Sequence, residues 1–203
     1  MNSQNIISAV ERIRAQVPMI DFRDKRMVLA NLIFMHQVMT ASERLLFEAA
    51  NETTGDLRAY YFAHMEEERG HVQWLADDLK SVGINVALMP KVQAAIALAG
   101  SQYYLMKHIS PFALLGYMLV LEGFPVAMEY VELLEVAHGK ELFRTLRYHS
   151  EHDIEHRKEL FSMIDVNPSA EIMDSATLTA TYINEFFTNL QSSALWEVLK
   201  DKE

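Results

Sequence analysis

Apolar residues along the chain recur mainly at the spacing of three and four positions that is typical of amphipathic helices. The 203 residues include only 7 glycines and 5 prolines, and this scarcity of helix-breaking residues favours long helices over many short strands. The spacing and the breaks together predict seven helices, over residues 3–17, 24–51, 54–81, 90–108, 110–139, 140–164 and from 167 onward. No repeat, linker or low-complexity tract divides the chain. We therefore expect one all-α domain over residues 1–203, folded as a single compact bundle.

Residues at the helix boundaries support this division. Asp24 and Ser110 precede predicted helices, and their side chains are of the type that accepts hydrogen bonds from the free N–H groups of a first turn. Pro18 follows the first predicted helix, and Asn167, which is followed by a proline, is the predicted cap of the last one. Each of these residues marks a helix boundary in the predicted fold.

The amino-acid composition excludes several kinds of site. The chain has no cysteine, so it cannot form a disulfide, a thiolate zinc site, an iron–sulfur cluster or a cysteine nucleophile, and any metal must be bound through nitrogen and oxygen. The net charge of −10 argues against a nucleic-acid partner. The N-terminal sequence lacks the pattern of a signal peptide, and no apolar run is long enough to cross a membrane. We therefore expect a cytoplasmic protein that binds neither nucleic acid nor membrane.

Two eight-residue sequences, "HMEEERGH" at 64–71 and "HSEHDIEH" at 149–156, contain five of the eight histidines. Each has a histidine, an acid and a histidine at relative positions 0, 4 and 7, which share one helix face because a helix turns by about 100° per residue. Imidazole and carboxylate groups are suitable ligands for iron, manganese or zinc. One such triad alone is more often a solvated face with local ion pairs, but two matching triads favour a metal site. The predicted ligands are His64, Glu68 and His71 from the first sequence and His149, Asp153 and His156 from the second.

Glu122 is a further candidate ligand. It lies in "VLEGFP" among apolar residues, and a buried lone carboxylate is costly unless it is protonated, paired or bound to a cation. The alternative is an ordinary surface corner. Pro125 removes a backbone donor within this predicted helix and should kink the helix near Glu122. His36 and Glu43 lie seven residues apart without a central acid, and they are weaker candidates for outer ligands or proton-handling groups.

In order and spacing, the sequences "FAHMEEERGHVQWLADDL", "GYMLVLEGFP" and "HSEHDIEHRKEL" resemble the heme-oxygenase-like di-iron oxidases, iron-containing redox enzymes related to the PqqC, TenA and CADD folds. The resemblance extends over residues 30–165 and implies a heme-oxygenase-like bundle of helices. It implies that the metal ligands are Glu68, His71, Glu122, His149, Asp153 and His156. Family members commonly add another carboxylate, and His64 stands at one of the positions where it would be expected. His64 is therefore an optional ligand.

The resemblance also implies an enzyme that binds iron, activates dioxygen and oxidises a small organic molecule such as an amine, an amino acid or a fatty acid. Two iron ions are expected, with one ion as the alternative because of His64, and manganese and zinc suit the same donors. The implied partners are the substrate, dioxygen and an external reductant, and a homodimer is left open. Aromatic residues near the triads are candidates for the pocket lining or for ordinary core, namely Tyr60, Tyr61, Phe62, Trp74, Tyr117, Phe124 and Tyr148.

Three alternative functions use the same residues differently. A ferritin-like iron-binding protein or ferroxidase would take carboxylates from four helices, with Glu43 among them. A cofactor-free oxidase of the PqqC type would use the histidines for acid–base catalysis. A heme-binding or partner-binding protein on the same scaffold would need an axial ligand such as His36 or His64.

Overall fold

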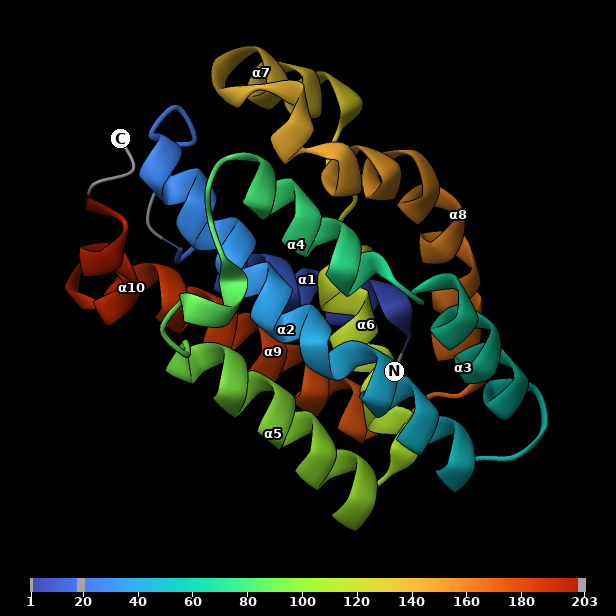
Figure 1. Cartoon of the computed structure of the whole chain (residues 1–203). Coiled ribbons are helices and arrows are strands. Elements are labelled where there is room, and N and C mark those ends of the chain that lie inside the picture. Colours follow the sequence, from blue (N-terminus) through green and yellow to red (C-terminus); the bar gives the residue numbers. More distant parts are fainter. Residues whose placement is uncertain (1, 18–20, 201–203) are drawn as a thin grey trace.

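In the computed structural model, which describes residues 2–17 and 21–200, every regular element is helical (Figure 1). The α-helices of this part of the chain are α1 (Ser3–Arg14), α2 (Lys25–Glu52), α3 (Gly55–Glu67), α4 (His71–Ser81), α5 (Gln93–His108), α6 (Leu114–Glu122), α7 (Met128–His138), α8 (Arg144–Val166), α9 (Ala170–Asn189) and α10 (Ala194–Val198). Short 3-10 turns are η1 (Val86–Leu88), η2 (Pro111–Ala113), η3 (Lys140–Leu142) and η4 (Leu190–Ser192). The all-α prediction is confirmed. The predicted number of about seven helices is wrong, because nine α-helices of the described residues have at least nine residues each.

Two of the predicted helices are each divided in two, which accounts for the additional elements. The helix expected over 54–81 breaks between α3 and α4, where Gly70 has a φ of 90°, a conformation that glycine adopts at little cost. The helix expected over 110–139 ends at Glu122, and α7 begins only at Met128. Pro125 lacks the backbone N–H that would continue the helix, so the kink predicted near Glu122 is a complete break.

The predicted caps have different outcomes. Asp24 accepts a backbone N–H from the first turn of α2 at 2.9 Å, and Ser110 accepts one from η2 at 3.3 Å, so both predictions are confirmed. The prediction that Asn167 caps the last long helix is wrong, because Asn167 ends α8 and α9 begins after Ser169. A residue that precedes a proline disfavours the helical conformation, which separates the two helices. Pro18 lies outside the described residues.

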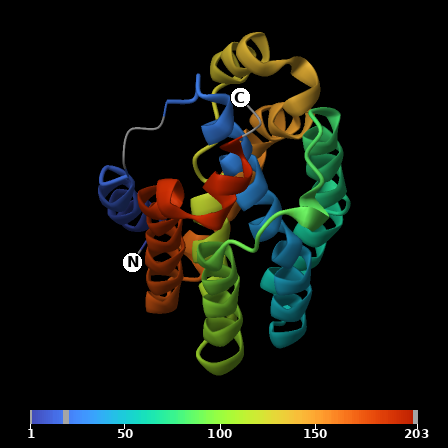
Figure 2. The same ribbon diagram turned by 60° about the vertical axis from the view of Figure 1, so that its left-hand side comes forward.

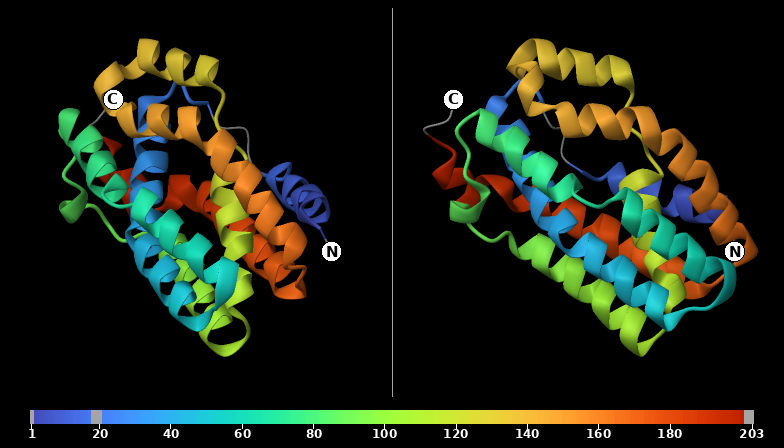
Figure 3. Two further views of the ribbon diagram at one scale, coloured as in Figure 1. Left: turned by 90° about the vertical axis from the view of Figure 1, so that its right-hand side faces the viewer. Right: turned by 45° about the vertical axis from the view of Figure 1, so that its right-hand side comes forward.

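The long helices lie side by side in one bundle. α2 packs against α3, α4 and α5, and α5 in turn packs along α9 (Figure 2). α7 lies at one end of the molecule, beside the start of α8 (Figure 3). Among the described helices, none has the length and apolar character needed to cross a bilayer.

α6 is the most deeply buried helix of the candidate site region. All its residues from Leu114 to Val120 are buried, as expected for a helix that is apolar all round. α6 packs closely against α9, and a Cβ added at Gly116 would lie only 2.0 Å from the carbonyl oxygen of Ile172. This close approach fixes the position of α6, and its last residue, Glu122, is thereby held in the interior beside α8.

The start of α8 is fixed by a buried aspartate of α4. Asp78 is 1% exposed and accepts hydrogen bonds from the backbone N–H of Thr145 and from Nε of Arg144, both at 2.8 Å. The first bond satisfies one of the N–H groups that a helix leaves free in its first turn. It therefore anchors α8 about one turn before His149.

Replacement of Asp78 by alanine should lower the free energy of unfolding by about 2 kcal/mol, because it leaves a buried backbone N–H without its partner. Urea denaturation followed by circular dichroism measures the change. Asp77→Ala is the matched control, since Asp77 is exposed and accepts its hydrogen bond from the Gln73 side chain on the surface. Equal losses of stability in the two variants would contradict an anchoring role for Asp78.

Candidate metal centre

The predicted ligands lie together although they come from different helices. Within the described residues, their donor atoms form two groups of three, and the atoms of each group all lie within 4.8 Å of one another. The first group consists of His64, Glu122 and His156, and the second group consists of Glu68, His71 and His149. The remaining predicted ligand, Asp153, lies between the two groups.

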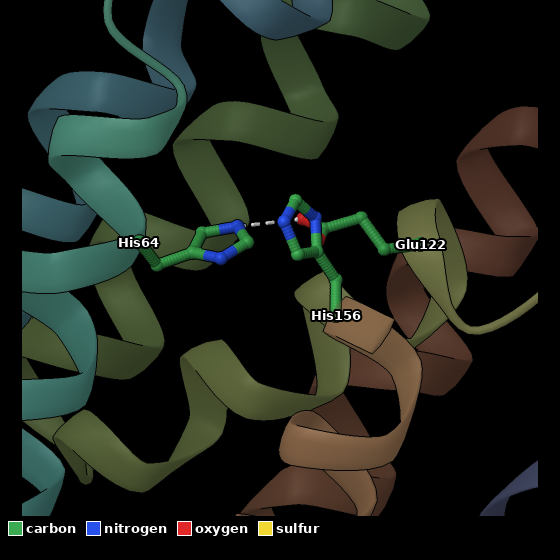
Figure 4. A group of neighbouring side chains, drawn as sticks. All are labelled: His64, Glu122 and His156. Atoms are coloured by element: carbon green, nitrogen blue, oxygen red, sulfur yellow. Dashed lines mark hydrogen bonds and ion pairs between the residues drawn. The ribbon is translucent and has the colours of Figure 1, made fainter. Parts of the chain in front are cut away.

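In the first group, three helices each contribute one side chain, and the side chains point toward one another (Figure 4). His64 comes from α3, Glu122 from the end of α6, and His156 from α8. Nε2 of His64 lies 3.0 Å from Oε1 of Glu122. The His64 side chain is 3% exposed and that of Glu122 is 12% exposed, so Glu122 is largely buried, as predicted.

The second group is assembled around the break at Gly70. Glu68 caps the end of α3 and His71 opens α4, and Oε2 of Glu68 lies 3.1 Å from Nδ1 of His71. The ring of His149, from α8, packs against that of His71 with 4.9 Å between the ring centroids. The prediction that the first triad occupies one face of a continuous helix is therefore wrong. Glu68 and His71 still meet, but His64 joins the other group because the chain turns between α3 and α4.

The outcome for the second triad is different, because α8 continues without a break from Arg144 to Val166. His149 reaches the second group, and His156 reaches the first. Oδ1 of Asp153 lies 3.1 Å from Nδ1 of His149 and 3.8 Å from Nδ1 of His156. His149, Asp153 and His156 thus share one face of α8, as the spacing predicts, and this face contributes to both groups, which the spacing does not predict.

Buried polar atoms without a partner are concentrated at this site. Among the described side chains, seven buried nitrogen or oxygen atoms have no hydrogen-bond partner, and five of the seven belong to the two groups, namely Glu68 Oε1, His71 Nε2, Glu122 Oε2, His149 Nε2 and His156 Nδ1. Buried polar atoms in folded proteins are nearly always paired. Cations bound among these atoms would satisfy them, and imidazole nitrogen with carboxylate oxygen is a donor set that suits iron. The residues present therefore fit a metal centre.

The carboxylates and imidazoles of the site shift one another's pKa values. Burial lowers the pKa of His64, but the charge and the hydrogen bond of Glu122, with smaller effects of Glu68 and Glu67, raise it to about 9. Burial raises the pKa of the Glu68 carboxyl, but the hydrogen bond with His71 and the neighbouring imidazoles bring it below its usual value. His64 thus holds a proton that a divalent cation would displace, since a histidine binds a metal as neutral imidazole.

A cavity of about 240 Å³ lies beside both groups. Its lining includes five of the predicted ligands, namely His64, Glu68, Glu122, His149 and Asp153. Most of the other lining residues are apolar, namely Leu32, Met35, Met39, Leu46, Leu75, Met118, Leu121, Phe124, Val126 and Leu146. The hydroxyl groups of Ser42 and Tyr117, which also line the cavity, hydrogen-bond to each other at 2.7 Å. No lysine or arginine of the described residues lines it, so the cavity combines apolar walls with the candidate ligands.

The aromatic candidates for the pocket lining divide into two sets. Tyr117 and Phe124 line the cavity, and the other five do not. Of these five, Trp74 and Tyr148 pack on the ring of His71, at centroid distances of 4.4 Å and 5.1 Å. They therefore hold a predicted ligand in place instead of contacting the cavity.

The sequence patterns missed two features of the site and included two residues that lie elsewhere. α2 lines the cavity with residues at helical spacing, a signal present in the sequence but shared with ordinary core positions. Glu67, for which the sequence predicted no role in the site, has Oε2 3.7 Å from Nδ1 of His64 and 3.6 Å from Nε2 of His156. Its position three residues after His64 on one helix was the available signal. His36 and Glu43 belong to neither group and do not line the cavity.

Most of this chain matches one known protein family. Residues 32–181 match a family described as iron-containing redox enzyme. The structure is similar to the crystal structure of a domain of unknown function with a heme oxygenase-like fold from Shewanella denitrificans OS217, with a TM-score of 0.72 and 16% sequence identity over 97% of this chain and 91% of that chain. At this identity the likeness shows the fold alone, and it confirms the predicted heme-oxygenase-like fold. No curated protein matches the sequence.

Proposed function

Because the chain belongs to the family of iron-containing redox enzymes, as its sequence predicts, we propose that it is a non-heme di-iron oxidase or oxygenase that uses dioxygen to oxidise a small organic substrate. The observation that carries this proposal is the set of five buried, unpaired donor atoms beside a cavity. The donors belong to two groups of similar composition, which supports two ions over one.

Each group would hold one iron ion through its two histidines and its glutamate, with Asp153 between the groups. Iron bound there would supply electrons for the reduction of dioxygen. The residues of the chain exclude water and orient the substrate. Apolar side chains such as Met118 and Leu121 keep water out of the cavity. The hydroxyl pair of Ser42 and Tyr117 offers a hydrogen-bonding point that can orient a polar group of the substrate.

The lining of the cavity favours a largely aliphatic substrate. Its walls are mostly apolar, and the described lining residues include no lysine or arginine that could pair with a carboxylate. Away from the candidate ligands, the described lining residues offer no charged group that would pair with a charged part of a substrate, and burying an unpaired charge is costly. A substrate with one polar group and an aliphatic chain that packs among the methionines and leucines, such as a fatty acid or a lipophilic amine, fits the cavity better.

Anaerobic reconstitution with a ferrous salt should give about two iron ions per chain, one for each group of ligands. A ferrous concentration 100 times the dissociation constant should raise the free energy of unfolding by about 2.7 kcal/mol for each ion bound, because the ions bind only to the folded protein. Elemental analysis measures the first quantity and chemical denaturation with and without iron measures the second. Protein that keeps far less than one ion and gains no stability would contradict the proposal.

Dioxygen uptake by the iron-loaded protein separates the proposed function from its alternatives. With an external reductant, uptake should rise on addition of an aliphatic amine or carboxylic acid from a graded series. A cofactor-free oxidase would be equally active after chelator treatment. A ferroxidase would consume dioxygen with ferrous iron alone, and it is less favoured because Glu43 lies outside both groups.

A further inference from the structure

In the second group, each histidine has one ring nitrogen facing a carboxylate. Nδ1 of His71 faces Glu68, and Nδ1 of His149 faces Asp153, each at 3.1 Å. The opposite nitrogens, Nε2 of both rings, are buried and without a partner. A histidine that binds a metal usually donates its other N–H to a carboxylate or carbonyl, which fixes the tautomer and the orientation of the ring. Glu68 and Asp153 therefore leave Nε2 of both histidines as the atom available to bind a metal.

Glu67 faces the first group in the same way. It is the last residue of α3, and its side chain is 49% exposed. Its Oε2 lies 3.7 Å from Nδ1 of His64 and 3.6 Å from Nε2 of His156. The opposite nitrogens point inward, because Nε2 of His64 faces Glu122 at 3.0 Å, and Nδ1 of His156 is buried without a hydrogen bond, 3.8 Å from Oδ1 of the predicted ligand Asp153. One carboxylate thus faces the outer nitrogens of two rings.

We propose that Glu67 is a positioning residue of the metal centre, and this inference rests on the proposed iron site. The Glu67 carboxylate faces the outer nitrogens of His64 and His156 at ion-pair distance and so favours Nε2 of the first and Nδ1 of the second as the atoms turned toward the ion of the first group. The negative charge of Glu67 also stabilises the bound cation, although Glu67 contacts the ligands and not the ion itself. The neighbouring Glu66 has a different role, since it pairs with Arg69 on the surface.

Anaerobic ferrous titrations of Glu67→Gln and Glu67→Ala test this role against the unmodified protein. One of the two sites should weaken by about 10-fold, the lower end of the effect of such outer partners, because the Glu67 side chain is half exposed. The other site should lose less affinity than this. Glu66→Gln is the matched control and should leave both sites unchanged. Circular dichroism of each variant establishes that it is folded, and the isosteric glutamine removes the charge with little change in shape.

Several outcomes would overturn the inference. Unchanged affinities in both Glu67 variants, or an equal loss at both sites, would remove the positioning role but leave the iron centre standing. Failure of the unmodified protein to bind iron would overturn the proposed function together with it. Nitrogen-15 NMR of the zinc-loaded protein is a second measurement that does not depend on activity. We expect zinc on Nδ1 of His156 and on Nε2 of His64, and the reverse assignment at either ring would overturn the inference.

Discussion

Replacement of His149 or His156 by alanine is expected to abolish tight iron binding at the group to which each belongs, while the protein stays folded. Each histidine contributes a buried nitrogen without a protein partner, so its loss leaves only two donors in that group. Loss of an outer residue that merely orients a ligand costs 10–100-fold in affinity, and loss of the ligand itself should cost more than about 100-fold. Alanine is the best helix former, so α8 should persist. Anaerobic ferrous titration with parallel circular dichroism measures both effects.

His108→Ala is the matched control for these substitutions. His108 ends α5, belongs to neither group, and packs against Tyr104 at a centroid distance of 5.0 Å. His138→Ala should also leave iron binding intact, but it is a less neutral control. Nε2 of His138 donates to the carbonyl oxygen of Phe22 at 2.8 Å, and loss of that bond should cost about 1 kcal/mol of stability. Comparable loss of iron in the control and ligand variants would mean that the clustered histidines are structural.

Gly116→Ala is expected to destabilise the protein by about 3 kcal/mol, because overpacking a core forces its backbone apart. The added Cβ would lie 2.0 Å from the carbonyl oxygen of Ile172 and 2.8 Å from the backbone nitrogen of Ala176. Both atoms belong to the backbone of α9, so no side-chain rotation relieves the contact. Since α6 ends at Glu122, its displacement should also weaken iron binding by the first group. Urea denaturation and ferrous titration of the same variant measure the two effects.

Gly100→Ala is the control for this substitution, because it places the same change in a helix that has room for it. Gly100 is exposed within α5, and a Cβ there would meet nothing within 4 Å. The variant should gain about 0.5–1 kcal/mol, since glycine in a helix interior is less stable than alanine by that amount. A gain of stability in both variants would show that the approach of α6 to α9 is looser than described.

The sequence predicted the helical fold and the ligand face of α8 because both follow from local rules. Asp24 caps α2 whatever lies around it, and an unbroken helix necessarily places His149, Asp153 and His156 on one side. The prediction that the first triad shares one helix was wrong because the break between α3 and α4 depends on packing and not on a local rule. A single glycine inside a helical pattern is compatible with a continuous helix, and only the packed fold places Gly70 in the left-handed conformation that ends α3.

The three consecutive acids at 66–68 show what periodicity alone cannot assign. Glu66 pairs with Arg69 on the surface, Glu67 faces two histidines of the first group, and Glu68 belongs to the second group. Their different surroundings depend on where α6 and α8 pass, which is a property of the whole bundle. The cavity is unpredictable for the same reason, because its walls come from helices that are distant in sequence.

The continuity of α8 links the two groups mechanically. One helix supplies His149 to the second group and His156 to the first, two turns and about 10 Å apart along its axis. An ion that fixes one of these histidines also restrains helix α8, which carries the other histidine. The other histidine is then less mobile when the second ion binds. The two groups are therefore expected to fill as a coupled pair, in which by reciprocity each ion changes the affinity for the other by the same factor.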